Sequence, residues 1–146
     1  MHPFGMIPSA TSSRFHATLR VDFCERRKPM VSNPLLENSE ILACDIAKLC
    51  NDKRIDSNVA CQIKKSSSSV FANISEAQYP QSLADMLSKF EIARKECMET
   101  ESWLKLMRST ESIDEEIFRK YRNLCGRIRR MLTASCITIE KKLSKD

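Results

Sequence analysis

The sequence predicts an all-α protein, an antiparallel up-and-down four-helix bundle that follows a disordered N-terminal extension. Helix breakers are scarce, because the 146 residues include only two glycines and the five prolines all lie within the first 80 positions. Four stretches between residues 34 and 143 repeat apolar side chains at steps of three and four, the spacing of one helix face. Short polar connections join these stretches, which favours antiparallel neighbours. The bundle is expected to form one domain over residues 33–146.

The extension, residues 1–32, contains Pro3, Pro8 and Pro29 and shows no helical or strand period. Such a segment buries too little apolar surface to offset its chain entropy, so we expect a disordered tail. A start codon assigned upstream of the true one is an equally open explanation. The first 21 residues lack acids, as organellar transit peptides do, which is a third interpretation.

The first helix is predicted over residues 34–51. Asn33 is a typical N-cap, and proline at position 34 suits the first helical position, where its missing N–H costs nothing. The polar run 51–54 ends the helix. Its predicted apolar stripe consists of Leu35 or Leu36, Leu42, Ile46, Leu49 and Cys50.

The second helix is predicted to start near Asp56 or Ser57 and to stop at Tyr79-Pro80, because the residue before proline is pushed out of the helical region. Ser66 to Ser69 lie inside it. We interpret these small residues as a surface that lets two helices approach closely, with a flexible serine linker as the alternative. The predicted stripe consists of Val59, Ile63, Ser66, Val70, Ile74 and Ala77.

The third helix is predicted to open with Ser82-Leu83-Ala84-Asp85, a capping box with Asp in place of Glu, and to end near Ser109. Its stripe consists of Leu83, Met86 or Leu87, Phe90, Ala93, Cys97, Leu104 and Met107. The fourth helix is predicted to start at Asp114, with Glu115 and Glu116 in the first turn, where the helix dipole favours acids. Its stripe consists of Ile117, Tyr121, Leu124, Ile128, Leu132, Ile139 and Leu143.

Composition argues against several functional classes. His2 and His16 are the only histidines, so the predicted bundle offers no histidine base for hydrolysis and no Glu-x-x-His pair for a metal. A glycine-rich phosphate loop is also excluded. We therefore predict no enzymatic activity, no cofactor and no metal. An apolar run of about 18 residues is missing, which excludes a membrane span.

The seven cysteines are odd in number and form no C-x-x-C pair. This pattern suits a reducing cytoplasm, with thiols used as small apolar packing residues; disulfide or metal use is the alternative.

Positive charge is concentrated at two places. The formal net charge is +5, of which residues 1–32 carry +3 and the other 114 residues only +2. Within those, residues 114–146 hold nine basic and five acidic side chains, a net +4. The spacing of four arginines predicts a phosphate-contacting strip away from the apolar stripe, and a merely solvated basic face is the alternative. The candidate nucleic-acid-binding residues are Arg119, Arg122, Arg127, Arg129 and Arg130, with Lys64 and Lys65 added if they project the same way.

Two further groups are candidates for structural roles. A polar network that sets helix register is predicted, in which Lys89 or Lys95 satisfies Glu76 and Asn73 bonds backbone or side chain. Its members are Asn73, Glu76, Lys89, Lys95, Glu96 and Glu99. Phe71 and Trp103 are candidates for a subunit interface, and a core or helix-seam position is the alternative for Trp103.

The run from Gln62 to Ala77, QIKKSSSSVFANISEA, is followed by Lys89, Ala93, Lys95-Glu96, Glu99-Thr100-Glu101 and Trp103-Leu104. This order and spacing resembles the two central helices of the 23S rRNA intervening-sequence proteins, bacterial four-helix bundles. The accessory variability determinant of diversity-generating retroelements is similar. The resemblance implies a homo-oligomeric ring of five subunits with a basic surface for RNA or DNA and, in the retroelement case, a reverse transcriptase partner. Two functions therefore stay open: a nucleic-acid-binding or ribonucleoprotein accessory, and a pure assembly or protein-interaction bundle.

Overall fold

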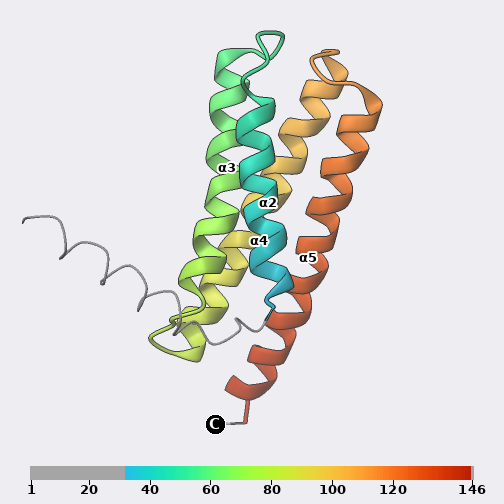
Figure 1. The fold of residues 1–146 in the computed structure, drawn as a ribbon. Helices are drawn as coiled ribbons and strands as arrows, with labels where there is room; N and C mark the ends of the chain where they lie inside the picture. The colour runs from blue at the N-terminus through green and yellow to red at the C-terminus, as the bar shows by residue number, and fades with distance from the viewer. Residues whose placement is uncertain (1–31, 146) are drawn as a thin grey trace, which may run out of the picture. The chain divides into compact units, whose positions relative to one another are not determined.

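The computed structural model describes residues 32–145, which form four helices: α2 (Pro34–Leu49), α3 (Ser57–Glu76), α4 (Leu83–Ser109) and α5 (Glu115–Leu143). Each helix packs against the next one in the chain, and α2 closes the ring against α5 (Figure 1). The diagonal pairs do not pack against each other within this described part. The predicted all-α up-and-down bundle is confirmed. The predicted disordered extension lies, apart from Ser32, outside the described residues.

The helices begin where the sequence predicts, because a capping side chain stands at each start. Asn33 accepts from the Leu36 N–H at 3.2 Å, Ser82 from Asp85 at 3.0 Å and Asp114 from Ile117 at 2.8 Å. Asp56 caps α3 in the same way. Each such cap contributes about 1 kcal/mol. The Asp85 carboxylate bonds the N–H of Gln81, one residue before the N-cap position that a regular capping box uses.

The four helices differ in length. α2 has 16 residues and α5 has 29. At about 1.5 Å per residue they extend roughly 24 Å and 44 Å, so α5 continues past the end of α2 (Figure 1). Leu143, predicted to end the apolar stripe, is 38% exposed because no α2 lies over that end of α5.

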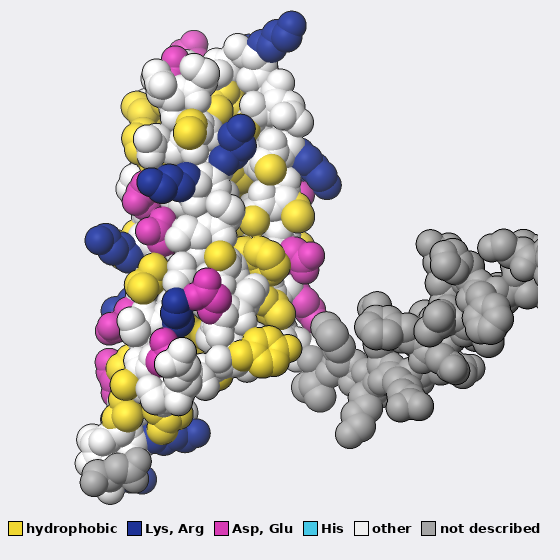
Figure 2. Space-filling model, turned by 90° about the vertical axis from the view of Figure 1, so that its left-hand side faces the viewer, with side chains coloured by type: hydrophobic (Ala, Val, Ile, Leu, Met, Phe, Trp, Pro, Cys, Tyr) yellow, Lys and Arg dark blue, Asp and Glu magenta, His cyan; other side chains and the backbone are white. Residues whose placement is uncertain are grey.

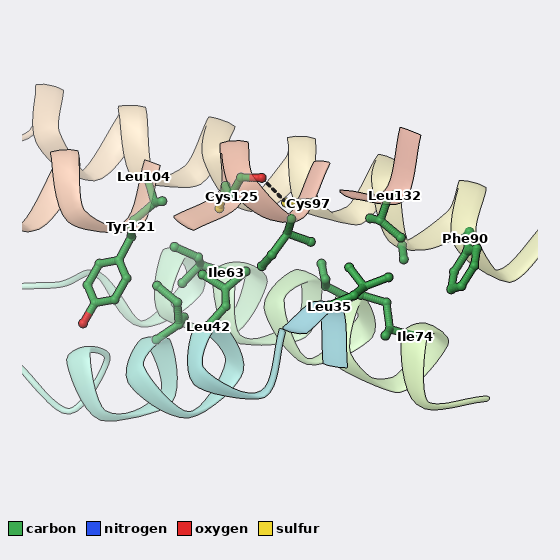
Figure 3. Packing of buried hydrophobic residues seen from close by; sticks show 14 of the residues in the cluster. Leu35, Leu42, Ile63, Ile74, Phe90, Cys97, Leu104, Tyr121, Cys125 and Leu132 are labelled. Carbon is green, nitrogen blue, oxygen red and sulfur yellow. Dashed lines mark hydrogen bonds between the residues drawn. The ribbon is translucent and has the colours of Figure 1, made fainter. Parts of the chain in front are cut away.

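The core contains one apolar row from each helix. In Figure 3, Cys97 and Cys125 lie side by side between Leu104 and Leu132, and the Cys97 thiol donates to the Cys125 carbonyl at 3.4 Å. In α5 the predicted Tyr121, Ile128, Leu132 and Ile139 are buried, and two other positions of the predicted stripe are displaced by one residue. Phe118 and Cys125 are buried, whereas the predicted Ile117 and Leu124 are only half-buried. Apolar residues flank the true stripe here, so spacing alone does not distinguish its centre from its edge.

The serine run is a packing surface, as predicted. Ser66 and Ser67 are buried within α3, while Ser68 is exposed. The Thr100 hydroxyl of α4 lies 2.8 Å from the Ser66 hydroxyl, and this contact requires close approach of the two helices. A flexible linker is excluded, because the run lies within one continuous helix.

The cysteines differ in burial, and Cys50 is half-buried. Cys97, Cys125 and Cys136 are buried, as expected of apolar packing residues, whereas Cys44 and Cys61 are exposed. All six cysteines between residues 32 and 145 are free thiols. None of the helices in that range is long and apolar enough to cross a membrane.

Candidate nucleic-acid interface

A polar groove of about 520 Å³ runs along α5 beside α4. Four arginines and one glutamate line it, which gives a formal net charge of +3. Cationic arginines at the wall of an open groove attract and bind anionic groups, since the guanidinium fork matches carboxylate and phosphate. The lining residues are Glu101, Arg122, Asn123, Gly126, Arg127, Arg129 and Arg130.

Glu101 is the carboxylate of this groove, and it is only 9% exposed. Its oxygens lie 2.9 Å from Arg129 Nη2 and 3.8 Å from Arg122 Nε. A buried carboxylate requires such partners, because an unpaired charge that has lost its water is destabilising. Arg129 is therefore held by α4, whereas Arg122 lies near the same carboxylate without a hydrogen bond to it, and its side chain is 57% exposed.

Arg129 is a structural residue as well as a basic one. Its side chain is 36% exposed, and its Nε is buried without an acceptor among residues 32–145. From the spacing of the sequence alone, Arg129 is equivalent to the other surface arginines of α5, and Glu101 is not among the predicted site residues. A signal was available, because Glu101 stands four residues after Cys97 and three before Leu104, both on the predicted stripe.

The remaining arginines of α5 face outward. Arg119 pairs with Glu115 at 2.9 Å on the same helix, and both side chains are largely exposed. Arg127 donates to the Asn38 side chain of α2 at 3.3 Å. Arg130 is exposed and has no ion pair within the described residues. In the predicted strip, Arg129 is thus anchored at the α4 seam, Arg122 is an exposed arginine near the same carboxylate, and the other three arginines are accessible.

The family model of the 23S rRNA-intervening sequence protein matches residues 33–134. The chain belongs to this family. Among solved structures, it is similar to a protein of unknown function from the S23 ribosomal protein family of Bacteroides thetaiotaomicron. The two share 34% sequence identity with a TM-score of 0.66, over 70% of this chain and 97% of that one. A search of curated proteins gave no match. The resemblance to the intervening-sequence proteins, predicted from the 62–77 run together with the residues that follow it between positions 89 and 104, is confirmed.

Two lysines of the family motif lie apart from the groove. Lys64 and Lys65 are exposed on α3, which is diagonal to α5 and does not pack against it. Lys64 lies near Cys50 at the end of α2, where burial raises the pKa of the Cys50 thiol and the lysine charge partly offsets this. These lysines do not extend the α5 groove.

The predicted polar network is present in parts. Lys89 forms an ion pair with Glu76 between α4 and α3, and the hydrogen bond that the lysine donates to this carboxylate raises the lysine pKa. Asn73 donates to the Ser69 carbonyl at 2.9 Å within α3. Glu99 accepts from Trp103 Nε1 at 3.3 Å within α4. The two remaining members, Lys95 and Glu96, make no side-chain contact with these groups within the described range.

The two candidate interface residues of this family member differ. Trp103 is half-buried and packs against the core, whereas Phe71 is half-buried without joining the core cluster. Figure 2 shows that hydrophobic side chains reach the surface between charged ones on the α3 side. Among residues 32–145, seven large apolar side chains are exposed: Ile41, Tyr79, Ile92, Met98, Leu106, Ile137 and Leu143. No group of three potential metal ligands occurs in the described chain.

Proposed function

We propose that this protein is a non-enzymatic, cytoplasmic homo-oligomer that binds nucleic acid as a ribonucleoprotein accessory. The observation that carries the proposal is the α5 groove. It holds a formal +3, while the whole of residues 33–146 holds only +2. Positive charge is therefore gathered at one place on an otherwise nearly neutral domain, the pattern of a phosphate-binding surface.

The three accessible arginines, Arg119, Arg127 and Arg130, are the residues proposed to contact phosphates. Their guanidinium forks donate paired hydrogen bonds to phosphate oxygens. Arg129, paired with Glu101 at 2.9 Å, and the nearby Arg122 add positive charge to the same groove. Phosphate contacts carry no base information, so binding is expected to be largely independent of sequence.

Formation of a homo-oligomer would increase the number of weak arginine–phosphate contacts made to one nucleic-acid chain. The family resemblance implies a ring of five subunits, in which five copies of α5 act on one bound chain and gain affinity through multivalency. RNA or DNA is the proposed ligand. A reverse transcriptase is the proposed protein partner, from the similarity to the retroelement accessory protein.

The test compares two triple variants of the full chain. R119Q/R127Q/R130Q removes the accessible arginines and leaves the Glu101 pair intact. K48Q/K53Q/K105Q removes the same charge from exposed lysines elsewhere. Fluorescence anisotropy with mixed-sequence RNA and DNA should show binding that falls steeply between about 50 and 200 mM salt. The arginine variant should bind at least about tenfold more weakly, with a smaller salt slope. Equal binding by both variants would show that α5 is only a solvated face.

A pure assembly bundle is the alternative function, and Phe71 favours it as a half-exposed aromatic outside the core cluster. Aromatic residues of this kind are enriched at interfaces. Light scattering should give several times the monomer mass of 16.8 kDa. An oligomer that binds no nucleic acid at low salt would favour the alternative, and a monomer at micromolar concentration would contradict the ring.

A further inference from the structure

Gly126 lies in the interior of α5, where glycine destabilises a helix relative to alanine. Its backbone is in the ordinary helical region, since no glycine in the described chain has a positive φ. A Cβ at this position would meet only Arg130 Nη1, at the ordinary contact distance of 3.7 Å. The packing of the monomer therefore does not require glycine here. What the glycine provides is an uncovered stretch of helix backbone in the floor of the groove.

A second hollow of about 430 Å³ adjoins the first. The two share Gly126, Arg129 and Arg130, so they form one continuous groove along α5. The second part is less polar, since Thr133, Ala134 and Ile137 line it. Ile137 is 45% exposed. The groove thus changes from a cationic half to a largely apolar half, with Gly126 and Arg130 at the junction.

We propose that this groove binds single-stranded nucleic acid, with a phosphate beside Gly126 between Arg127 and Arg130 and the adjoining unpaired base on Ala134 and Ile137. The proposal deepens the proposed function by naming the form of the ligand. In a duplex the bases are paired and stacked inside, so they do not reach an apolar floor next to a bound phosphate. An unpaired base does, and single-strand sites combine a positive groove with surfaces for base contact.

An acidic peptide is the competing ligand, because its carboxylates and apolar side chains also place an anionic group next to an apolar one. The net +3 of the cationic half favours the nucleic acid, whose backbone carries a charge at every residue along the groove. The apolar half is shallow and open, which suits the flat face of a base.

The experiment measures binding of the full-length protein to a labelled strand of about 20 nucleotides and to the matching duplex. The single strand should bind about tenfold more tightly. Gly126→Ala should keep the fold, with an equal or higher melting temperature, and weaken single-strand binding several-fold. Ile137→Ser should weaken single-strand binding and leave duplex binding unchanged. Ile41→Ser, which removes an equally exposed isoleucine from α2, is the matched control and should change neither.

The outcomes separate this inference from the function on which it rests. If the strand and the duplex bind equally and Ile137→Ser has no effect, while R119Q/R127Q/R130Q still abolishes binding, the single-strand site is overturned and the nucleic-acid function stands. If neither nucleic acid binds, both are overturned. If poly-glutamate displaces the strand at equal charge concentration, the groove is a site for acidic peptides and the inference fails.

Discussion

The hydroxyls of Thr100 in α4 and Ser66 in α3 form a hydrogen bond of 2.8 Å inside the bundle, and both residues are fully buried. Ser66 in turn donates to the Ile63 carbonyl at 3.2 Å, so the pair satisfies its own hydrogen-bonding needs. Ser66 belongs to the first half of the family motif and Thr100 to the second. The two halves of the motif therefore contact each other, and the motif specifies how closely α3 and α4 approach.

Replacing Ser66 with leucine should separate the two helices. The added side chain enters a filled space, and overpacking of this kind costs about 1–3 kcal/mol. Ser68→Leu, two residues away but exposed, is the matched control and should change the free energy of unfolding by less than about 0.5 kcal/mol. Urea denaturation measures the free energy of unfolding of both variants. Equal effects of the two substitutions would contradict the close α3–α4 contact.

Thr100→Val removes the hydroxyl but keeps the shape of the side chain. The lost hydrogen bond should lower the free energy of unfolding by about 1 kcal/mol. Thr138 likewise donates to the carbonyl four residues earlier, Ala134, as Thr100 does to Glu96, but Thr138 is exposed and contacts no hydroxyl of another helix among the described residues. Thr138→Val should therefore have almost no effect in the same thermal or urea unfolding experiment. A neutral Thr100→Val would show that the buried hydroxyl pair adds nothing to stability.

Glu101→Gln should destabilise the bundle, because the neutral amide no longer neutralises the positive charge of the partly buried Arg129. We expect a loss of about 1–3 kcal/mol on urea unfolding, and a similar loss for Arg129→Gln. The double variant should lose less than the sum of the two, since the residues interact directly. Glu91→Gln, an exposed change on the same helix, serves as the control. Strict additivity would mean that the 2.9 Å ion pair contributes no coupling.

The sequence predicted the helices and their starts because capping residues and apolar spacing are local signals. Asn33, Ser82 and Asp114 act at the positions where they were expected. The arginine strip was predicted less well. Helical spacing tells which side of α5 a residue occupies, but it does not tell that Glu101 of α4 faces Arg129. That pairing depends on the packing of two helices, which no local pattern contains.

Thiol reactivity should follow burial. The thiolate is the nucleophile, and a hydrogen bond with Cys97 together with burial raises the pKa of Cys125 far above its ordinary value. Burial likewise raises the pKa of Cys136. Mass spectrometry after brief alkylation of the native protein should find Cys44 and Cys61 modified before these two. Labelling of Cys125 as fast as Cys61 would contradict the described core.

The last prediction concerns the turn between α2 and α3. Arg54 bonds the Asp52 carboxylate through its guanidinium at 2.7 Å and through its backbone N–H at 2.9 Å. These two hydrogen bonds lower the pKa of Asp52 from 3.8 to about 2. Because the folded-state pKa lies below the unfolded one, the contribution to stability is present above about pH 4 and is lost as the pH falls toward about 2. The contribution is small, since this turn is exposed to solvent and screened.

An NMR titration of the Asp52 carboxyl carbon tests this directly. At about pH 3 the wild-type carboxylate should still be mostly ionised, whereas Arg54→Gln should move its midpoint back toward 3.8. A wild-type midpoint near 3.8 would mean that the Arg54 hydrogen bonds do not persist in solution.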